Sequence, residues 1–276
     1  MYQNFEKMLI QKLNFLVFKK GSPSANFGNI QNGLQLTAPF TSFKDLGKQS
    51  GWLFYVPAEY TSKIDAETGF VNLFNMKEAA KNPVDFFKAF QSIEYHNGLF
   101  YFTFDYSNND LHTVKTDYTN VWTLSSHGER IAMMKNVESQ KMEPKIVNLT
   151  EEMKTVFCEK IELESISKDA IIHHPDAESI CRELFYKFKL LLQMRNSMPN
   201  DETVDYLISP VATTTPFKTG PDNAMGIKDA DANGAYHIAL KGLYLLLNDF
   251  PKEGDYLQRI TTAEWLKFVQ MHTYRS

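Results

Sequence analysis

The hexapeptide DADANG, at residues 229–234, carries two aspartates ahead of a helix-forming segment. Hard divalent cations such as Mg²⁺ prefer carboxylate oxygens, so Asp231 predicts metal-assisted chemistry with partner ligands from elsewhere. Two other interpretations compete. A calcium loop of the EF-hand type needs a glutamate at its twelfth position, where this chain has Leu240. Aspartate is also an ordinary helix cap, which leaves the hexapeptide with a structural role only.

Arg195 is the second candidate, within LQMRNS at residues 192–197. It ends a helix predicted over residues 177–195, and Asp205 follows in a segment predicted to be a loop. An arginine can hold a phosphate through two parallel hydrogen bonds, and a nearby carboxylate can orient it. A cation also suits the C-terminus of a helix without any further role. The segment alone leaves both interpretations open.

The aromatic stripe formed by Phe100, Phe102, Phe104 and Tyr106 lies on one face of a predicted strand. Such a stripe can stack nucleic-acid bases, but it is more often the core of a sheet. No glycine-rich phosphate loop, nucleophile elbow or zinc-protease motif occurs in the chain. The sequence therefore lacks the signatures of the P-loop, dinucleotide-binding, serine-hydrolase and zincin classes.

The elements that position these residues are predicted from periodicity and turn signals. Asn97 and Gly98 predict a hairpin between strands over residues 93–95 and 99–106. Further elements are expected as follows: a helix near residues 5–16, a buried strand over 51–57, strands over 118–125 and 130–135, loops over 196–228, and helices over 232–246 and 262–271. The segments 1–65, 66–228 and 229–276 are expected to form three successive parts of the chain.

Composition narrows the function classes. The chain has 276 residues, with 29 Lys and Arg against 33 Asp and Glu, so its formal net charge is −4. This acidic balance argues against a freestanding nucleic-acid binder, which normally carries a basic excess. Cys158 and Cys181 stand alone, which fits a reducing compartment and no structural zinc site. No apolar run is long enough for a membrane helix.

Five motifs occur together in order and carry a resemblance to a known family. They are YQNFEKMLI at 2–10, QSGWLFYVP at 49–57, YTSKID at 60–65, LQMRNS at 192–197 and DADANGAYHIALKG at 229–242. Over essentially the whole chain, the sequence resembles the C-terminal part of type V-A CRISPR-associated, RNA-guided DNA endonucleases. The resemblance implies an incomplete RuvC-like, RNase H-type α/β nuclease domain at residues 1–65 and 229–276. It also implies an inserted α+β Nuc domain at 66–228.

The resemblance assigns roles to the candidate residues. Asp231 corresponds to the third acidic residue of the RuvC site, which hydrolyses DNA phosphodiesters with Mg²⁺. Arg195 corresponds to the arginine of the Nuc domain that positions the target strand, and Asp205 matches a nearby acidic residue. Target DNA and a guide RNA are the implied partners in the full-length protein, and the cytoplasm of a prokaryote is the implied location.

The family's other two catalytic carboxylates lie upstream of the region that this chain resembles. The sequence therefore predicts that the isolated chain does not cleave DNA, because one carboxylate cannot assemble a two-metal site. The alternative hypothesis is a noncatalytic, truncated fragment that binds nucleic acid or a protein partner. The segments 1–65 and 229–276 are expected to pack together, with Asp231 near the predicted strand around Leu53 to Val56.

Overall fold

The computed structural model describes residues 56, 58–106, 121–199, 201–248 and 261–272. The chain forms two compact units, one made of residues 1–59 and 236–261 and the other of residues 60–235 and 262–276. The predicted N-terminal helix lies outside the described residues, as does the predicted strand over 51–57 except for Val56. Its expected proximity to Asp231 and the boundaries at 65/66 and 228/229 stay predictions.

Short polar residues start several helices of the described chain. The side chains of Asn75, Asn82, Asn148 and Ser167 each accept a backbone N–H from the first turn of the helix that follows. The helices are α2 (Met76–Ala79), α3 (Pro83–Lys88), α4 (Leu149–Phe157), the 3-10 helix η5 (Leu163–Ser165), α5 (Lys168–Ile172), α6 (Ala177–Leu191), α7 (Ala230–Asn248) and α8 (Thr262–His272).

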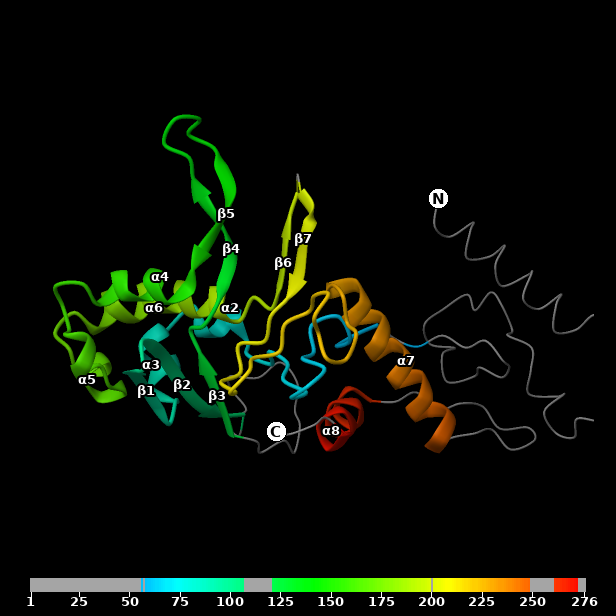
Figure 1. The fold of residues 1–276 in the computed structure, drawn as a ribbon. Helices are drawn as coiled ribbons and strands as arrows, with labels where there is room; N and C mark the ends of the chain where they lie inside the picture. The colour runs from blue at the N-terminus through cyan, green and yellow to red at the C-terminus, as the bar shows by residue number, and fades with distance from the viewer. Residues whose placement is uncertain (1–55, 57, 107–120, 200, 249–260, 273–276) are drawn as a thin grey trace, which may run out of the picture. The chain divides into compact units, whose positions relative to one another are not determined.

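A three-stranded antiparallel sheet lies in the unit that contains residues 60–235 (Figure 1). Its strands are β1 (Ser92–His96), β2 (Leu99–Asp105) and β3 (Val121–Ser125), with β2 in the centre. Asn97 and Gly98 turn the chain between β1 and β2 with φ angles of 51° and 77°. Asparagine and glycine adopt this left-handed conformation most easily, which is why the pair forms a tight hairpin. The predicted hairpin is confirmed.

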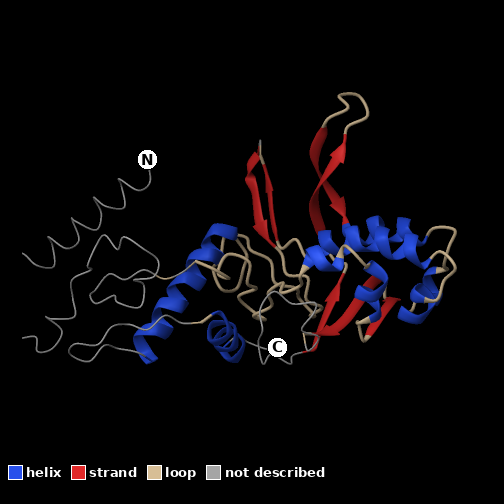
Figure 2. Ribbon diagram, turned by 180° about the vertical axis from the view of Figure 1, so that it is seen from behind, coloured by secondary structure: helices blue, strands red, loops and turns tan. Residues whose placement is uncertain are grey.

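One face of β2 forms an aromatic core with the helices. Phe100, Phe102, Phe104 and Tyr106 are at most 2% exposed, so the interpretation as sheet core is confirmed and no base can stack on them. Phe188 of α6 lies over this face, with its ring centroid 5.0 Å from that of Phe102. In Figures 1 and 2, α4 and α6 run side by side next to the sheet.

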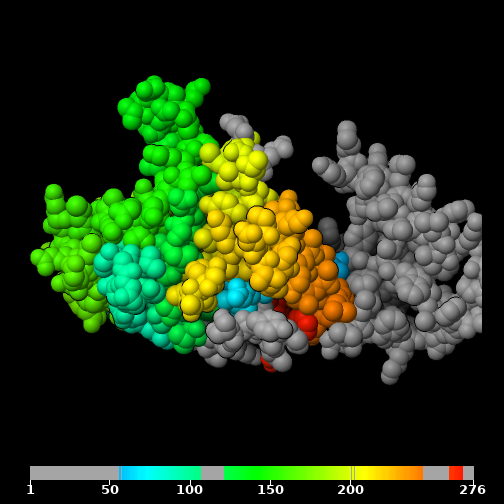
Figure 3. All heavy atoms as spheres, in the orientation of Figure 1, coloured from blue at the N-terminus to red at the C-terminus, as the bar shows by residue number. Residues whose placement is uncertain are grey.

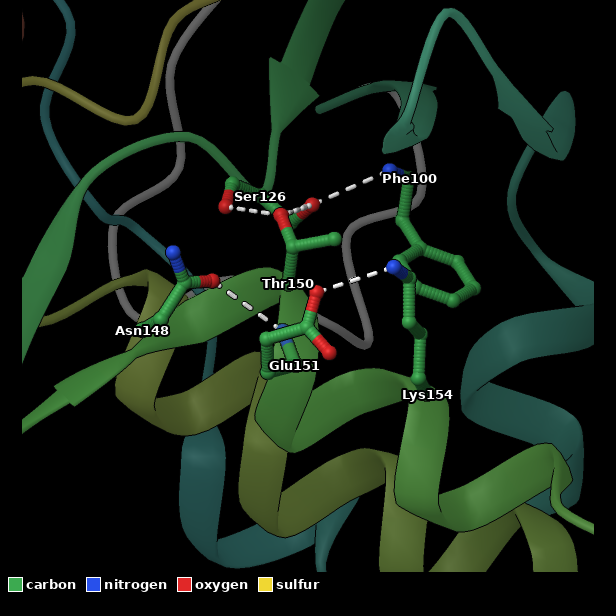
Figure 4. Close-up of polar contacts among 6 residues, drawn as sticks. All are labelled: Phe100, Ser126, Asn148, Thr150, Glu151 and Lys154. Atoms are coloured by element: carbon green, nitrogen blue, oxygen red, sulfur yellow. Dashed lines mark hydrogen bonds and ion pairs between the residues drawn. The ribbon is translucent and has the colours of Figure 1, made fainter.

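A buried polar cluster ties the start of α4 to the sheet (Figure 4). The hydroxyl of Thr150 donates to the carbonyl oxygen of Ser126 at 2.8 Å, and the two hydroxyl oxygens lie 2.7 Å apart. The hydroxyl of Ser126 accepts the backbone N–H of Phe100 at 3.0 Å. These bonds satisfy polar groups that are nearly inaccessible to water, so they fix where α4 begins relative to β2.

Two separate antiparallel ribbons complete the same unit. The first pairs β4 (Glu129–Lys135) with β5 (Met142–Asn148), and its tip stands out from the surface of the unit in Figure 3. The second pairs β6 (Arg195–Met198) with β7 (Asp201–Leu207). The prediction that Arg195 ends the long helix is wrong, because α6 ends at Leu191 and Arg195 opens β6. The prediction of loops over residues 196–228 is wrong up to Leu207, where β6 and β7 lie, and is confirmed for residues 208–228, which contain no named helix or strand.

Candidate nuclease site

The structure brings Arg195, Asp205 and Asp231 together. One guanidinium nitrogen of Arg195, Nη1, lies 2.9 Å from Oδ1 of Asp231, and the other, Nη2, lies 3.3 Å from Oδ2 of Asp205. The side chain of Asp231 is 78% exposed, whereas that of Asp205 is only 24% exposed. One guanidinium therefore joins an open carboxylate to a sheltered one.

The ribbon of β6 and β7 sets the pairing between Arg195 and Asp205. Arg195 is opposite Leu207 and Ser197 is opposite Asp205, so Arg195 and Asp205 are diagonal neighbours on one face of the ribbon. The predicted interpretation of Arg195 as a cation at a helix end is wrong, because the residue opens a strand. The side chain instead projects from a paired strand toward two carboxylates.

Asn196 anchors β6 to the neighbouring ribbon. Its side chain is buried, and Oδ1 accepts the backbone N–H of Ile131 in β4 at 2.9 Å. The side chain of Gln193 donates both to this oxygen, at 3.1 Å, and to the carbonyl of Ile131, at 2.9 Å. The residue next to Arg195 therefore fixes its strand, and sequence reasoning did not single it out.

The first turn of α7 presents Asp231, and its neighbours hold that turn in place. Oδ1 of Asp229 accepts the backbone N–H of Ala232 at 2.7 Å, which makes Asp229 the N-cap. The buried side chain of Asn233 donates to the carbonyl oxygen of Ile64 at 2.9 Å. The helix-cap interpretation of the hexapeptide thus applies to Asp229, and it leaves the carboxylate of Asp231 open.

Asp65 is a further carboxylate beside the anchor of this turn, because it follows Ile64, whose carbonyl oxygen accepts the bond from Asn233. It is fully buried and accepts the backbone N–H groups of Glu67 at 2.8 Å and Thr68 at 3.2 Å. Burial raises its pKa, while hydrogen bonds from Ser209 and Thr68 act in the opposite direction. Asp65 therefore holds the turn on which α7 is fixed, and its satisfied oxygens are not open to a ligand.

A buried cation lies at the base of the β4–β5 ribbon. Arg130 is fully buried, and its Nη1 donates to the carbonyl oxygen of Glu129 at 3.0 Å. Its Nε and Nη2 are buried without a hydrogen-bond partner among the described residues. Burial lowers the pKa of Arg130 to about 10, and burial together with Arg130 lowers the pKa of His127 to about 4. No local sequence pattern marks His127 or Arg130, since their pKa shifts depend on burial.

The low pKa of His127 predicts a loss of stability in mild acid. The unfolded chain binds a proton near pH 6.5 but the folded chain only near pH 4, so stability falls as the pH drops through this window. At about 1.4 kcal/mol per pH unit, the full loss is about 3 kcal/mol. His127→Gln is expected to flatten this dependence in urea denaturation at pH 7, 5.5 and 4. The matched change at the exposed His173 is expected to leave it intact; an unchanged slope in His127→Gln contradicts the assignment.

The donor set near Arg195 suits a hard cation only in part. Asp231 offers an open carboxylate, and Oδ1 of Asp205 is buried without a partner in the described chain. Both are oxygen ligands of the kind that Mg²⁺ takes. Among the described residues, however, no group of three or more His, Cys, Asp or Glu side chains is arranged to hold a metal. Asp231 can contribute to a metal site, and further ligands must join it.

The family model of the RuvC nuclease domain matches residues 1–274. The chain belongs to the RuvC nuclease domain family. The match extends over nearly the whole chain, so the expectation of a RuvC-type nuclease is confirmed. The small sheets and several helices of the structure are consistent with this domain. The more specific assignment to the type V-A endonucleases and the inserted Nuc domain stay predictions.

The assignment of Asp231, Arg195 and Asp205 to the nuclease site also stays a prediction.

None of the described helices combines the length and the apolar character needed to cross a membrane. The sequence predicted that Asp205 orients Arg195, and the contact between their side chains is found, but it did not connect this pair with Asp231. It did not identify Asn196 or Asp65, although each lies within a motif that supported the resemblance.

Proposed function

We propose that this RuvC nuclease domain is the C-terminal RuvC and Nuc portion of a type V-A, RNA-guided DNA endonuclease of CRISPR antiviral defence. It hydrolyses DNA phosphodiesters with Mg²⁺ when it is joined to the upstream part of the protein. Target DNA and guide RNA are its partners there. The observation that supports this proposal is the open carboxylate of Asp231 beside Arg195, at the start of a capped helix.

The charges of Asp231, Arg195 and Asp205 indicate how each residue would act in phosphodiester hydrolysis. When bound, a divalent ion would supply a water nucleophile of lowered pKa and would neutralise charge on the reacting phosphate. Asp231 would hold that ion through its exposed carboxylate, together with two acidic residues from upstream segments. Arg195 donates hydrogen bonds to phosphate oxygens, for which a planar guanidinium is well suited. Asp205 keeps the guanidinium oriented.

A complementation experiment tests the proposal. The purified chain alone, with Mg²⁺ and single-stranded or double-stranded DNA, is expected to give no cleavage, because the described residues hold no complete metal site. Addition of a separately produced upstream part, with its guide RNA, is expected to restore guide-dependent cleavage of the matching DNA.

Two outcomes contradict the proposal. Cleavage by the chain alone that Asp231→Ala abolishes shows that the chain assembles a metal site without upstream ligands. Failure of the upstream part to restore cleavage, although the two parts form a complex in size-exclusion chromatography, favours the noncatalytic alternative.

A further inference from the structure

The β4–β5 ribbon has an outer edge along β4. Just after this strand, the backbone N–H of Asn136 donates to the carbonyl oxygen of Lys141 at 2.8 Å, so the backbone groups of Asn136 face β5. In an antiparallel pair the backbone groups of successive residues face the two edges of a strand in turn. Ile131, Met133 and Lys135 therefore direct their N–H and C=O groups away from β5.

Side chains close only the base of this edge. The N–H of Ile131 donates to Oδ1 of Asn196, and its carbonyl oxygen accepts from Nε2 of Gln193, each at 2.9 Å, as a neighbouring strand would do. Toward the tip, Met133 is 58% exposed and Lys135 is exposed, and the two ribbons stand apart in Figures 1 and 2. Within the described chain β4 pairs with no strand other than β5. The outward backbone groups of Met133 and Lys135 are therefore open to another polypeptide.

The opposite edge of the ribbon is blocked by a proline. Pro144 of β5 is the register partner of Met133, so it occupies an outward-facing position of its own strand. Proline has no N–H to offer, and proteins commonly place it on an edge strand to prevent pairing with other chains. The ribbon thus resists strand addition along β5 and permits it along β4.

We propose that β4 binds an extended segment of a partner protein as an additional strand, with an acidic side chain of that segment beside Lys135. Main-chain hydrogen bonds supply the affinity in this mode of peptide recognition, and side chains at alternate positions supply the specificity. Opposite charges on neighbouring strands stabilise their pairing, which selects an acidic residue at Lys135. The exposed side chain of Met133 offers apolar surface to a second residue of the same segment.

A second copy of this chain fits the edge less well. Two copies of β4 pair in antiparallel fashion about a two-fold axis. An axis through Met134 or Lys135 makes the two Lys135 side chains diagonal or direct neighbours, and like charges destabilise such pairs. An axis through Met133 places Lys135 against Ile131, whose outward groups are already bonded. The charge of this edge therefore favours an acidic partner over self-pairing.

Fluorescence anisotropy of a short labelled peptide, measured with the full chain, tests the proposal. The probe alternates valine and threonine, which favour extended strands, around one glutamate. Met133→Pro removes an outward N–H without removing a bond between β4 and β5, and it is expected to weaken binding by about 10-fold or more. Met133→Ala keeps the N–H and is the matched control. It is expected to weaken binding by less than about 5-fold, the worth of one cross-strand side-chain contact.

Two changes in the probe test the same edge without altering the fold of the chain. N-methylation of the peptide backbone is expected to abolish binding, because it removes the N–H groups that β4 would accept. Replacing the glutamate by lysine is expected to weaken binding to the unsubstituted chain more than binding to Lys135→Gln.

Four results overturn the proposal: absence of binding, equal binding of the methylated and unmethylated probes, equal affinity in a folded Met133→Pro variant, and equal loss from the lysine probe in Lys135→Gln. A dimer in sedimentation velocity that Met133→Pro dissociates identifies a second copy as the occupant and overturns it as well. Arg195 and Asp231 are not part of this edge, so the proposed function and this inference stand or fall separately.

Discussion

Asp231→Asn is expected to lower the rate of DNA cleavage by at least about 100-fold in the nuclease reconstituted from this chain and its upstream part. Asparagine keeps the size of the side chain but removes the charge that, in the proposed function, holds a divalent ion. Loss of a residue that only supports a metal ligand typically lowers metal affinity or activity by about 10- to 100-fold. Loss of the ligand itself is therefore expected to lower the rate further. Single-turnover cleavage of a labelled DNA duplex at saturating Mg²⁺ measures the effect.

The fold of the variant is not expected to change. The side chain of Asp231 is 78% exposed, and substitutions at such positions usually alter stability by less than about 0.5 kcal/mol. Asp222→Asn, at another exposed aspartate, is the matched control and is expected to retain the full rate. If Asp231→Asn cleaves as fast as this control, Asp231 is not a metal ligand of the reaction.

Phe188→Ala is expected to lower the free energy of unfolding by about 3–5 kcal/mol, the usual cost of deleting a buried aromatic side chain. Phe188 is fully buried at the centre of the aromatic core. The centroids of the rings around it lie 5.0–5.9 Å away, from Phe74, Phe86, Phe87, Phe90 and Phe102. Urea denaturation followed by tryptophan fluorescence measures the change.

A second substitution on the same helix provides the control. Tyr186 is also aromatic and lies in α6, but it is 65% exposed. Tyr186→Ala is expected to cost less than about 1 kcal/mol, because little apolar surface is returned to water. Similar losses in the two variants indicate that the helix itself, rather than the core packing, determines the effect.

Local sequence was sufficient to predict those elements whose determining contacts are local. Asn97 and Gly98 adopt the positive φ angles that a two-residue hairpin turn needs, and the predicted turn is found there. The end of the long helix was misplaced because its determinants are distant. Asn196 accepts a hydrogen bond from Ile131, 65 residues away, and this contact favours a paired strand where periodicity alone extends the helix.

In the candidate site, too, local sequence identifies residues, whereas their arrangement depends on distant contacts. Residue type and position made Arg195 and Asp205 a candidate pair and Asp231 a separate candidate. Their meeting depends on the register between β6 and β7 and on the bond from Asn233 to Ile64, neither of which a pattern in one segment encodes. Asp65, His127 and Arg130 were missed because their properties arise from burial among residues far apart in the chain.

The N-cap formed by Asp229 affects how alanine scanning of DADANG is interpreted. Alanine at 229 removes the acceptor for the N–H of Ala232, so the first turn of α7 loosens and displaces the carboxylate two residues later. Reduced activity in such a variant reports on backbone order rather than on ligation. Serine at 229 restores a capping hydroxyl without a charge, so comparing the two substitutions separates a structural aspartate from a chemical one.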